Sequence, residues 1–224
     1  MEKPWLKSYP EGVPAEVDVT QYASLIELME EGFSKYAQRD AYALMGKTIT
    51  FGELDRMSAA FGAWLQSKGL KKGTRVAIML PNVLQYPVVL AGTIRSGCVV
   101  VNVNPLYTAR ELEHQLKDSG AEVIVILENF ATTLQQVLSK TPVKHVILAS
   151  MGDLLGFPKG AIVNFALRRV KKMVPAYSLP GSLKFNDVMA EGARGQLTKV
   201  EASPDDVAFL QYTGGTTGVS KGAT

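Results

Sequence analysis

Residues 51–103 read FGELDRMSAAFGAWLQSKGLKKGTRVAIMLPNVLQYPVVLAGTIRSGCVVVNV. The first part, 51–69, spaces its apolar side chains as an amphipathic helix does and ends at a glycine, which is typical of a helix C-terminus. The short apolar runs 75–80 and 98–103 are typical of buried strands, and residues 83–97 between them predict an apolar helix. This order of helix, strand, helix and strand predicts an α/β fold.

The alternation continues to the end of the HVILAS run. Residues 109–120 and 130–140 have the pattern of helices, whereas 122–127 (EVIVIL) and 145–150 (HVILAS) have the composition of buried strands. Strands separated by helices of this length pair in parallel through right-handed crossovers. We therefore expect a mostly parallel βαβ sheet flanked by helices.

Changes in composition divide the chain into four regions. Residues 1–20 are rich in proline and predict an N-terminal arm, and 21–150 form the α/β subdomain. Glycine and proline interrupt 151–200, which predicts an insertion that contains a basic amphipathic helix. Residues 201–224 would then begin the next α/β subdomain.

The overall composition excludes several classes of protein. With 46% apolar and 20% charged residues among 224, and without an apolar run of bilayer length, the chain is predicted to be globular and soluble. Its polar, proline-rich start predicts no secretory signal, and the net charge of +3 does not suggest binding to nucleic acid.

Cysteine and histidine usage predicts neither a disulfide nor a metal site. Cys98 is the only cysteine and lies in an apolar run, so we expect a buried core residue in a protein of the reducing cytosol. His114 and His145 do not have the spacing of metal ligands.

Three polar strand exits mark the edge of the sheet where ligands are expected. Asn82 follows the strand at 75–80, Asn104 follows the strand at 98–103, and a glycine-rich run follows the apolar residues 207–210. Ligands of parallel sheets gather at the carboxyl ends of the strands. For the two asparagine turns, simple turn chemistry is the favoured interpretation.

The glycine-rich run carries the predicted chemistry. Its glycines permit close approach of the backbone to a ligand, its N–H groups and threonine hydroxyls are anion donors, and its lysine adds a full positive charge. These features suit the phosphates of ATP, although the spacing is not that of a Walker A loop. The predicted phosphate-binding residues are Tyr212, Thr213, Gly214, Gly215, Thr216, Thr217, Gly218, Val219, Ser220, Lys221, Gly222 and Ala223.

Here the sequence resembles the adenylate-forming enzymes, a superfamily of acyl- and aryl-CoA ligases, luciferases and peptide-synthetase adenylation domains. Their phosphate loop commonly reads Thr-Ser-Gly-Ser/Thr-Thr-Gly-x-Pro-Lys-Gly, and residues 213–222 depart from it at Gly215 and Ser220. The resemblance also covers 48–54 (TITFGEL) and 97–126. The combination is most similar to the N-terminal part of bacterial long-chain fatty acid:CoA ligases.

The resemblance implies an ATP-dependent, AMP-forming acid-thiol ligase. A fatty acid carboxylate would attack the α-phosphate of Mg-ATP to give an acyl-adenylate, and CoA would then displace AMP. ATP and Mg²⁺ are the implied cofactors, and a long-chain fatty acid and CoA are the implied substrates. No catalytic residue and no Mg²⁺ ligand is assigned in these residues.

The resemblance also implies that the chain is a partial N-terminal domain. We therefore expect the 224 residues alone not to form acyl-CoA. We also expect exposed apolar surface, and with it self-association into a homo-oligomer.

A predicted amphipathic helix at 160–174 (GAIVNFALRRVKKMV) has two interpretations. Its apolar face, which includes Ile162, would either pack on the core or lie on a membrane, with Asn164 on the opposite polar face. Four cations are candidates for contact with an anionic lipid surface, on the cytoplasmic face of the inner membrane. They are Arg168, Arg169, Lys171 and Lys172.

Two alternative functions stay open. The chain would belong to another adenylating ligase, specific for an aryl, short-chain or amino acid, if the shared phosphate loop served a different acid pocket. It would be a non-catalytic module that binds a membrane or partner if residues 160–174 were its functional element.

Overall fold

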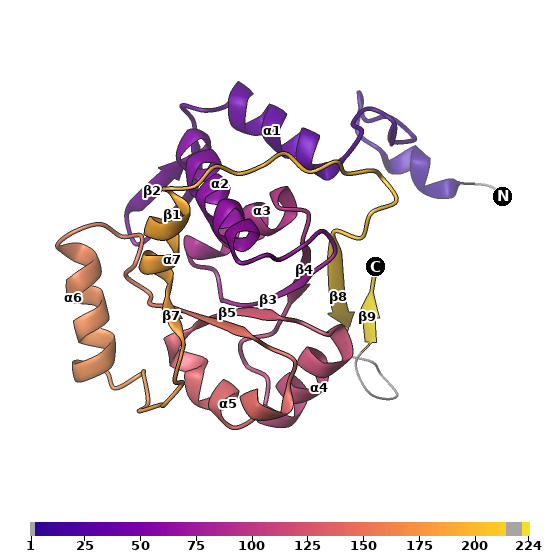
Figure 1. Cartoon of the computed structure of the whole chain (residues 1–224). Helices are drawn as coiled ribbons and strands as arrows, with labels where there is room; N and C mark the ends of the chain where they lie inside the picture. Colours follow the sequence, from indigo (N-terminus) through magenta and orange to yellow (C-terminus); the bar gives the residue numbers. More distant parts are fainter. Residues whose placement is uncertain (1–2, 214–220) are drawn as a thin grey trace.

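The computed structural model describes residues 3–213 and 221–224 (Figure 1). Its α-helices are α1 (Leu25–Lys35), α2 (Phe51–Ser67), α3 (Gln85–Arg95), α4 (Ala109–Ser119), α5 (Ala131–Gln135), α6 (Lys159–Phe165) and α7 (Phe185–Gly192). Its strands are β1 (Asp40–Leu44), β2 (Lys47–Thr50), β3 (Arg75–Met79), β4 (Val99–Asn102), β5 (Val123–Leu127), β6 (His145–Ala149), β7 (Leu183–Lys184), β8 (Phe209–Thr213) and β9 (Lys221–Ala223).

The central sheet confirms the predicted α/β class. Among the described residues, seven strands pair in the order β7-β6-β5-β3-β4-β8-β9, and every pair is parallel except β8 with β9. In the middle of the sheet, Ala77 of β3 pairs with Val101 of β4 and Ile124 of β5. These strands are almost continuously apolar because helices cover both of their faces.

Successive residues of each central strand enter two different cores. Val76 and Ile78 of β3 belong to the core beneath α1, α2, α3 and α7, whereas Ala77 and Met79 belong to the core beneath α4 and α5. Figure 1 shows these two helical layers on opposite sides of the sheet. The arrangement follows from the alternation of side chains along a strand.

Helices α2 and α3 approach each other through glycines. A Cβ atom added at Gly92 of α3 would lie 2.6 Å from the backbone oxygen of Ser58 in α2, and one added at Gly62 would lie 3.0 Å from the backbone oxygen of Gly92. Neither glycine has a positive φ angle. Both are therefore explained by close packing and not by backbone conformation.

Residue pairs at the helix N-termini explain where two of the helices begin. In α2, Thr50 accepts the N–H of Glu53, and the Glu53 carboxylate accepts the N–H of Thr50. Thr108 and Glu111 make the same reciprocal pair in α4. Each pair satisfies backbone N–H groups that the helix itself leaves free.

The predicted helix over 130–140 is interrupted. Helix α5 ends at Gln135, and a separate 3₁₀ turn covers Leu138–Lys140. The backbone of Val137 has a φ angle of −126°, which is outside the helical range.

The helix predicted at 160–174 forms as α6 followed by a π-helical stretch, Ala166–Val170, but its faces differ from the prediction. Ile162 was assigned to a buried or membrane-facing side and is 62% exposed. Asn164 was assigned to the solvated side, which is wrong, because its side-chain oxygen accepts the N–H of Gly152 at 2.7 Å. Gly160 packs so closely on Gly152 that an added Cβ would meet its oxygen at 2.2 Å.

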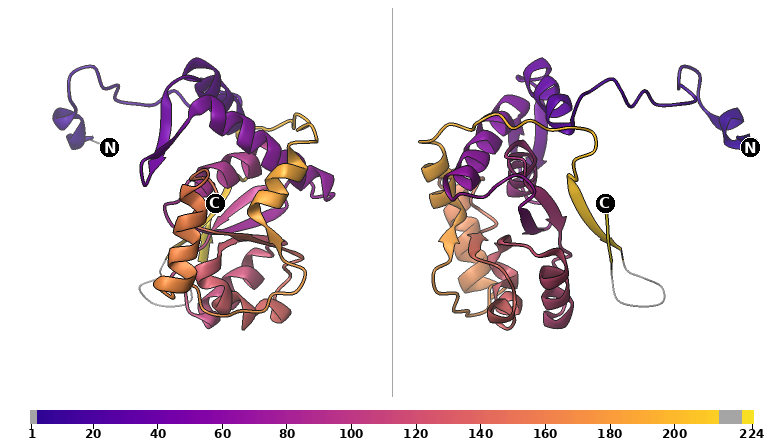
Figure 2. Two further views of the ribbon diagram at one scale, coloured as in Figure 1. Left: turned by 90° about the vertical axis from the view of Figure 1, so that its left-hand side faces the viewer. Right: turned by 45° about the vertical axis from the view of Figure 1, so that its right-hand side comes forward.

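The N-terminal region extends away from the helical layers (Figure 2). From residue 3 to residue 24 it contains one 3₁₀ helix, Pro4–Ser8, and Val17 and Val19 are more than 80% exposed. No helix within 3–213 or 221–224 is both long enough and apolar enough to cross a bilayer.

We expect Gly92→Ala to lower the free energy of unfolding by about 1–3 kcal/mol, because the new methyl group collides with backbone and not with a flexible side chain. Gly32→Ala in α1 is the matched control, since nothing lies within 4 Å of its Cβ position. Denaturation with urea should show the control unchanged or more stable by up to about 1 kcal/mol. Equal stability of the two variants would contradict the packing argument.

Candidate functional site

The carboxyl ends of β3, β4 and β8 meet at one cleft. Because β4 pairs in parallel with β3 on one side and β8 on the other, the three strands end at the same edge of the sheet. The cleft there has a volume of ≈ 370 Å³. Its lining includes Asn82, Asn104 and Tyr212, one residue from each of the three strand exits that the sequence singled out.

A chain of side-chain hydrogen bonds crosses the floor of this cleft. The Tyr86 hydroxyl donates to Oδ1 of Asn102 at 2.9 Å, and Nδ2 of Asn102 donates to Oε1 of Gln211 at 2.9 Å. The Gln115 side chain donates to the backbone oxygen of Asn102 at 2.7 Å. These contacts join α3, β4, β8 and α4 and fix the direction of each amide group.

The sequence prediction missed this network, although a signal for it was present. Asn102 is the polar last residue of the otherwise apolar strand β4, and Gln211 follows the apolar start of β8. In a sheet covered on both faces, such a residue marks the place where a strand leaves the core. To predict that Asn102 and Gln211 bind each other, one must know the strand order. This order places β4 beside β8, although the two residues are 109 positions apart in the sequence.

Tyr212 is anchored at the end of β8. Its side chain is 8% exposed, and its hydroxyl donates a 2.6 Å hydrogen bond to Oδ2 of Asp118, at the end of α4. Burial, followed by the hydrogen bond and charge of Asp118, raises the pKa of the Tyr212 hydroxyl well above its ordinary value. The hydroxyl therefore keeps its proton and remains a donor.

The predicted phosphate-binding run, residues 212–223, begins in β8 and ends in β9. Thr213 pairs with Lys221 and Tyr212 with Gly222 in an antiparallel hairpin, while Gly214, Gly215, Thr216, Thr217, Gly218, Val219 and Ser220 lie outside the described residues. A Cβ atom added at Gly222 would meet the Tyr212 ring at 3.0 Å. The glycine therefore lets β9 lie close against the anchored ring.

A second polar cluster lies where β5 and β6 end. Glu128 is almost completely buried, and both of its carboxylate oxygens accept hydrogen bonds from the Arg168 side chain, at 3.1 and 3.0 Å. Arg168 also donates to the Ser150 hydroxyl, and the Asp153 carboxylate accepts the Ser150 N–H at 2.7 Å. Burial raises the pKa of Asp153 to about 6.

The contacts of Arg168 in this cluster distinguish it from the other three predicted membrane-surface cations. Arg168 is tied to the end of β5 by its contact with Glu128. Arg169, Lys171 and Lys172 are exposed, and within the described part of the chain they make no ion pair.

The other titratable residues that the sequence singled out lie away from the cleft. Cys98 is buried, as predicted, and burial raises the pKa of its thiol. His145 packs edge-on against Trp64 with 5.9 Å between ring centroids, and burial with nearby Lys68 lowers its pKa. Over residues 3–213 and 221–224, no group of three or more His, Cys, Asp or Glu side chains is arranged to hold a metal ion.

Comparison with known proteins gives a family match for the larger part of the chain. The family of AMP-binding enzymes matches residues 29–224. Long-chain-fatty-acid–CoA ligases from Yersinia pestis and Escherichia coli O157:H7 are 55% and 54% identical over the whole chain, which covers 40% of the length of each. The chain therefore spans less than half the length of these curated relatives.

Solved structures share the fold. A long-chain-fatty-acid-CoA ligase from Archaeoglobus fulgidus matches 96% of this chain with a TM-score of 0.68 and 25% identity, and 38% of that protein is covered. An anthranilate CoA ligase in complex with anthranoyl-AMP matches 88% of this chain with a TM-score of 0.70 and 19% identity, over 33% of its own length.

We expect Tyr212 and Asp118 to be energetically coupled by about 1 kcal/mol, because their hydrogen bond involves a charged acceptor that is partly exposed to water. A double-mutant cycle of Tyr212→Phe and Asp118→Ala, followed by urea denaturation, measures this coupling. The cycle corrects for any separate effect of removing a carboxylate from the end of α4. Strictly additive losses would show that Asp118 does not hold the end of β8.

Proposed function

Because the chain belongs to the family of AMP-binding enzymes, we propose that it takes part in the ATP-dependent formation of long-chain fatty acyl-CoA. The observation that carries this proposal is the cleft where β3, β4 and β8 end, beside the strand that leads into the glycine-rich run. The relatives with 50–55% identity along the whole chain support the choice of long-chain fatty acids over other carboxylic acids.

The residues at this edge fit a nucleotide. A cleft of ≈ 370 Å³ lies within the usual range of ligand pockets, and its amide and hydroxyl side chains are suited to polar atoms of a base or ribose. In our proposal the backbone N–H groups and threonines of residues 213–222 bind the polyphosphate, and Lys221 adds a positive charge. Bound ATP supplies the phosphoanhydride bond whose cleavage activates the carboxylate.

Strand β8 leads into the proposed phosphate-binding residues and is held in place by side-chain hydrogen bonds. Tyr212 is fixed by Asp118, and Gln211 is fixed through Asn102, so the strand that enters the loop is held from two sides. Donors that are fixed before substrate arrives need little rearrangement when negative charge develops on the leaving pyrophosphate. We propose that any Mg²⁺ enters with ATP and is bound mainly by phosphate oxygens.

We expect Lys221→Ala to weaken binding of a fluorescent ATP analogue about 10- to 100-fold, since a hydrogen bond to a charged group contributes about 1.5–3 kcal/mol. Lys184→Ala is the matched control, because Lys184 is an exposed lysine of β7, at the opposite edge of the sheet. Fluorescence titration of the chain measures both affinities. The same loss in both variants, or none in Lys221→Ala, would refute phosphate binding at this loop.

We also propose that the protein contacts anionic membranes through what we call the α6 surface. Its apolar side chains are 56–94% exposed, which is costly in water and is relieved by insertion between lipids. Its three cations are each expected to contribute about 1 kcal/mol near an anionic lipid surface. The α6 surface consists of Phe157, Ile162, Phe165, Arg169, Val170, Lys171, Lys172 and Met173.

This proposal places the protein on the cytoplasmic face of the inner membrane and leaves Arg168 to a structural role. The Arg168 side chain is bound by the buried Glu128, so its charge is already paired. Association of two copies through the same apolar side chains is the competing explanation of their exposure. Association of two copies requires no anionic lipid, so a dependence on anionic lipid distinguishes membrane contact from self-association.

We expect the triple variant Arg169→Glu, Lys171→Glu, Lys172→Glu to lose more than 100-fold in affinity for vesicles that contain anionic lipid, since about 3 kcal/mol of attraction is removed. The control variant Lys35→Glu, Lys140→Glu, Lys184→Glu has the same net charge and leaves α6 unchanged. Cosedimentation with vesicles measures binding. If both variants bind equally, the α6 surface is not the lipid contact.

A further inference from the structure

The tip of the β1–β2 hairpin carries an apolar side chain in an unusual backbone conformation. Leu44 pairs with Lys47 across a tight turn formed by Met45 and Gly46, whose φ angles are 50° and 74°. Hairpin turns in which both central residues have positive φ angles favour asparagine or aspartate before the glycine. Met45 occupies that position instead, and its side chain is 51% exposed.

Met45 is unfavourable for both the backbone and the solvent. A side chain with a Cβ atom disfavours a positive φ angle, and the short polar groups of asparagine and aspartate tolerate it best. Among the described residues, Met45 and Lys172 are the two non-glycine residues with positive φ. Lys172 belongs to the α6 surface. Backbone strain of this kind is concentrated at sites that contact ligands, which directs attention to the region that the two residues share.

The hairpin and α6 are joined at the tip. The side-chain nitrogen of Lys159, the first residue of α6, donates a hydrogen bond to the carbonyl oxygen of Met45. Beneath this contact a small core contains Leu44 and Ile49 of the hairpin and Val163 of α6. Figures 1 and 2 both show the hairpin beside the start of α6. The tip and the α6 surface therefore belong to one packed unit.

Charge along the hairpin is unevenly distributed. Lys47 follows the turn and Lys159 contacts it, and neither makes an ion pair within residues 3–213 and 221–224. The one acidic residue of the two strands, Asp40, lies at the opposite end of the hairpin, where it pairs with Thr50. An apolar tip flanked by cations fits an anionic lipid surface, where the apolar group enters the boundary and the ammonium groups stay among the headgroups.

We propose that Met45 inserts into anionic membranes as a second contact beside the α6 surface. This inference rests on the membrane contact proposed for the α6 surface and adds a separate element to it. A single helix on a membrane can rotate about its own axis, whereas two insertion points fix one orientation of the protein. A second copy of the chain fits this face less well, because a symmetric contact would bring like charges together.

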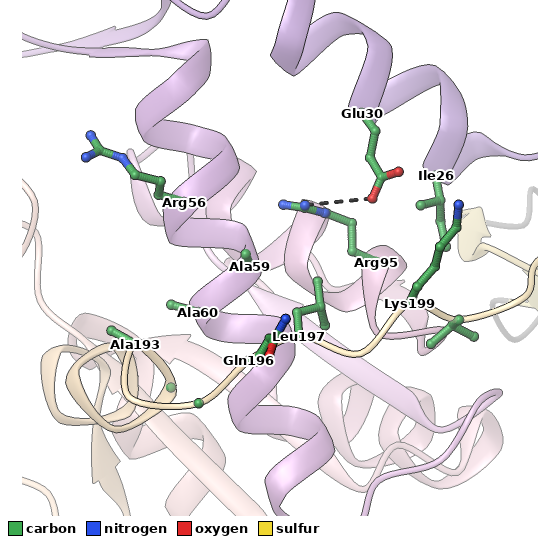
Figure 3. A pocket seen from close by; sticks show the side chains of 13 residues that line it. Ile26, Glu30, Arg56, Ala59, Ala60, Arg95, Ala193, Gln196, Leu197 and Lys199 are labelled. Atoms are coloured by element: carbon green, nitrogen blue, oxygen red, sulfur yellow. Dashed lines mark ion pairs between the residues drawn. The ribbon is translucent and has the colours of Figure 1, made fainter.

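The side of the molecule formed by α1 and α2 provides a matched control. Figure 3 shows that Arg56 of α2 points away from Arg95 and Lys199, so these cations do not gather at one point. Leu28 of α1 is 43% exposed, compared with 51% for Met45. Leu28 is thus a similarly exposed apolar side chain without a cluster of cations beside it.

Cosedimentation of the Met45→Asp variant with vesicles that contain anionic lipid tests the proposal. Aspartate tolerates the backbone of the turn, so the hairpin is kept while the inserting side chain becomes a carboxylate. We expect binding to weaken by about tenfold or more, because insertion of the apolar side chain is lost. Leu28→Glu adds the same charge and should bind within about twofold of the unchanged protein.

Insertion is measured directly with a fluorophore that is sensitive to its environment. Cys98 is 2% exposed, so the label reacts with a cysteine introduced as Met45→Cys or, in the control, as Leu28→Cys. We expect addition of anionic vesicles to raise the fluorescence at residue 45 by about twofold or more and to leave residue 28 unchanged. Circular dichroism verifies that each variant is folded.

Equal binding of Met45→Asp and Leu28→Glu, or unchanged fluorescence at residue 45, would overturn the inference. A rise in fluorescence with protein concentration, without vesicles, would also overturn it by showing association of two copies. The triple variant of the α6 surface distinguishes the two proposals. If it loses binding while Met45→Asp keeps it, the hairpin inference fails alone; if the unchanged protein does not bind anionic vesicles, both fail.

Discussion

The parallel pairing of β4 with β3 on one side and β8 on the other determines where the polar groups of this protein meet. Both faces of β3 and β4 are covered by helices, so a polar side chain of these strands is accommodated where the strand leaves the core. Asn102 lies at the end of β4, and there it binds Gln211 of the partly exposed strand β8. The cleft is therefore a consequence of strand order and not of any single loop.

Close contacts between helices maintain that order from one side of the sheet. The glycines at which α2 crosses α3 and α7 let the three helices form a thin layer over β3 and β4. Two cavities of ≈ 480 Å³ each lie beside α2, and Ala60 of α2 lines both of them. The helix packing that supports the cleft at the ends of β3, β4 and β8 thus also shapes cavities elsewhere in the layer.

Local patterns were sufficient to predict the class of fold and the strands that end at the cleft, because burial on both faces makes a strand continuously apolar. They were insufficient for contacts between distant residues. The bond from Tyr212 to Asp118 and the pairing of Arg168 with Glu128 depend on which elements become neighbours. The faces of the helix predicted at 160–174 were misassigned because Asn164 binds Gly152 through a specific hydrogen bond, which a hydrophobic pattern does not contain.

The most direct test of this account is a titration of the isotopically labelled chain with ATP, followed by ¹H–¹⁵N NMR spectroscopy. We predict that the side-chain amides of Asn82, Asn102 and Gln211 and the backbone amides of Thr213 and Lys221 shift together. Signals of helix α2, such as the backbone amide of Ala60, should stay in place. Shifts that avoid the ends of β3, β4 and β8 would contradict the claim that this edge of the sheet binds the nucleotide.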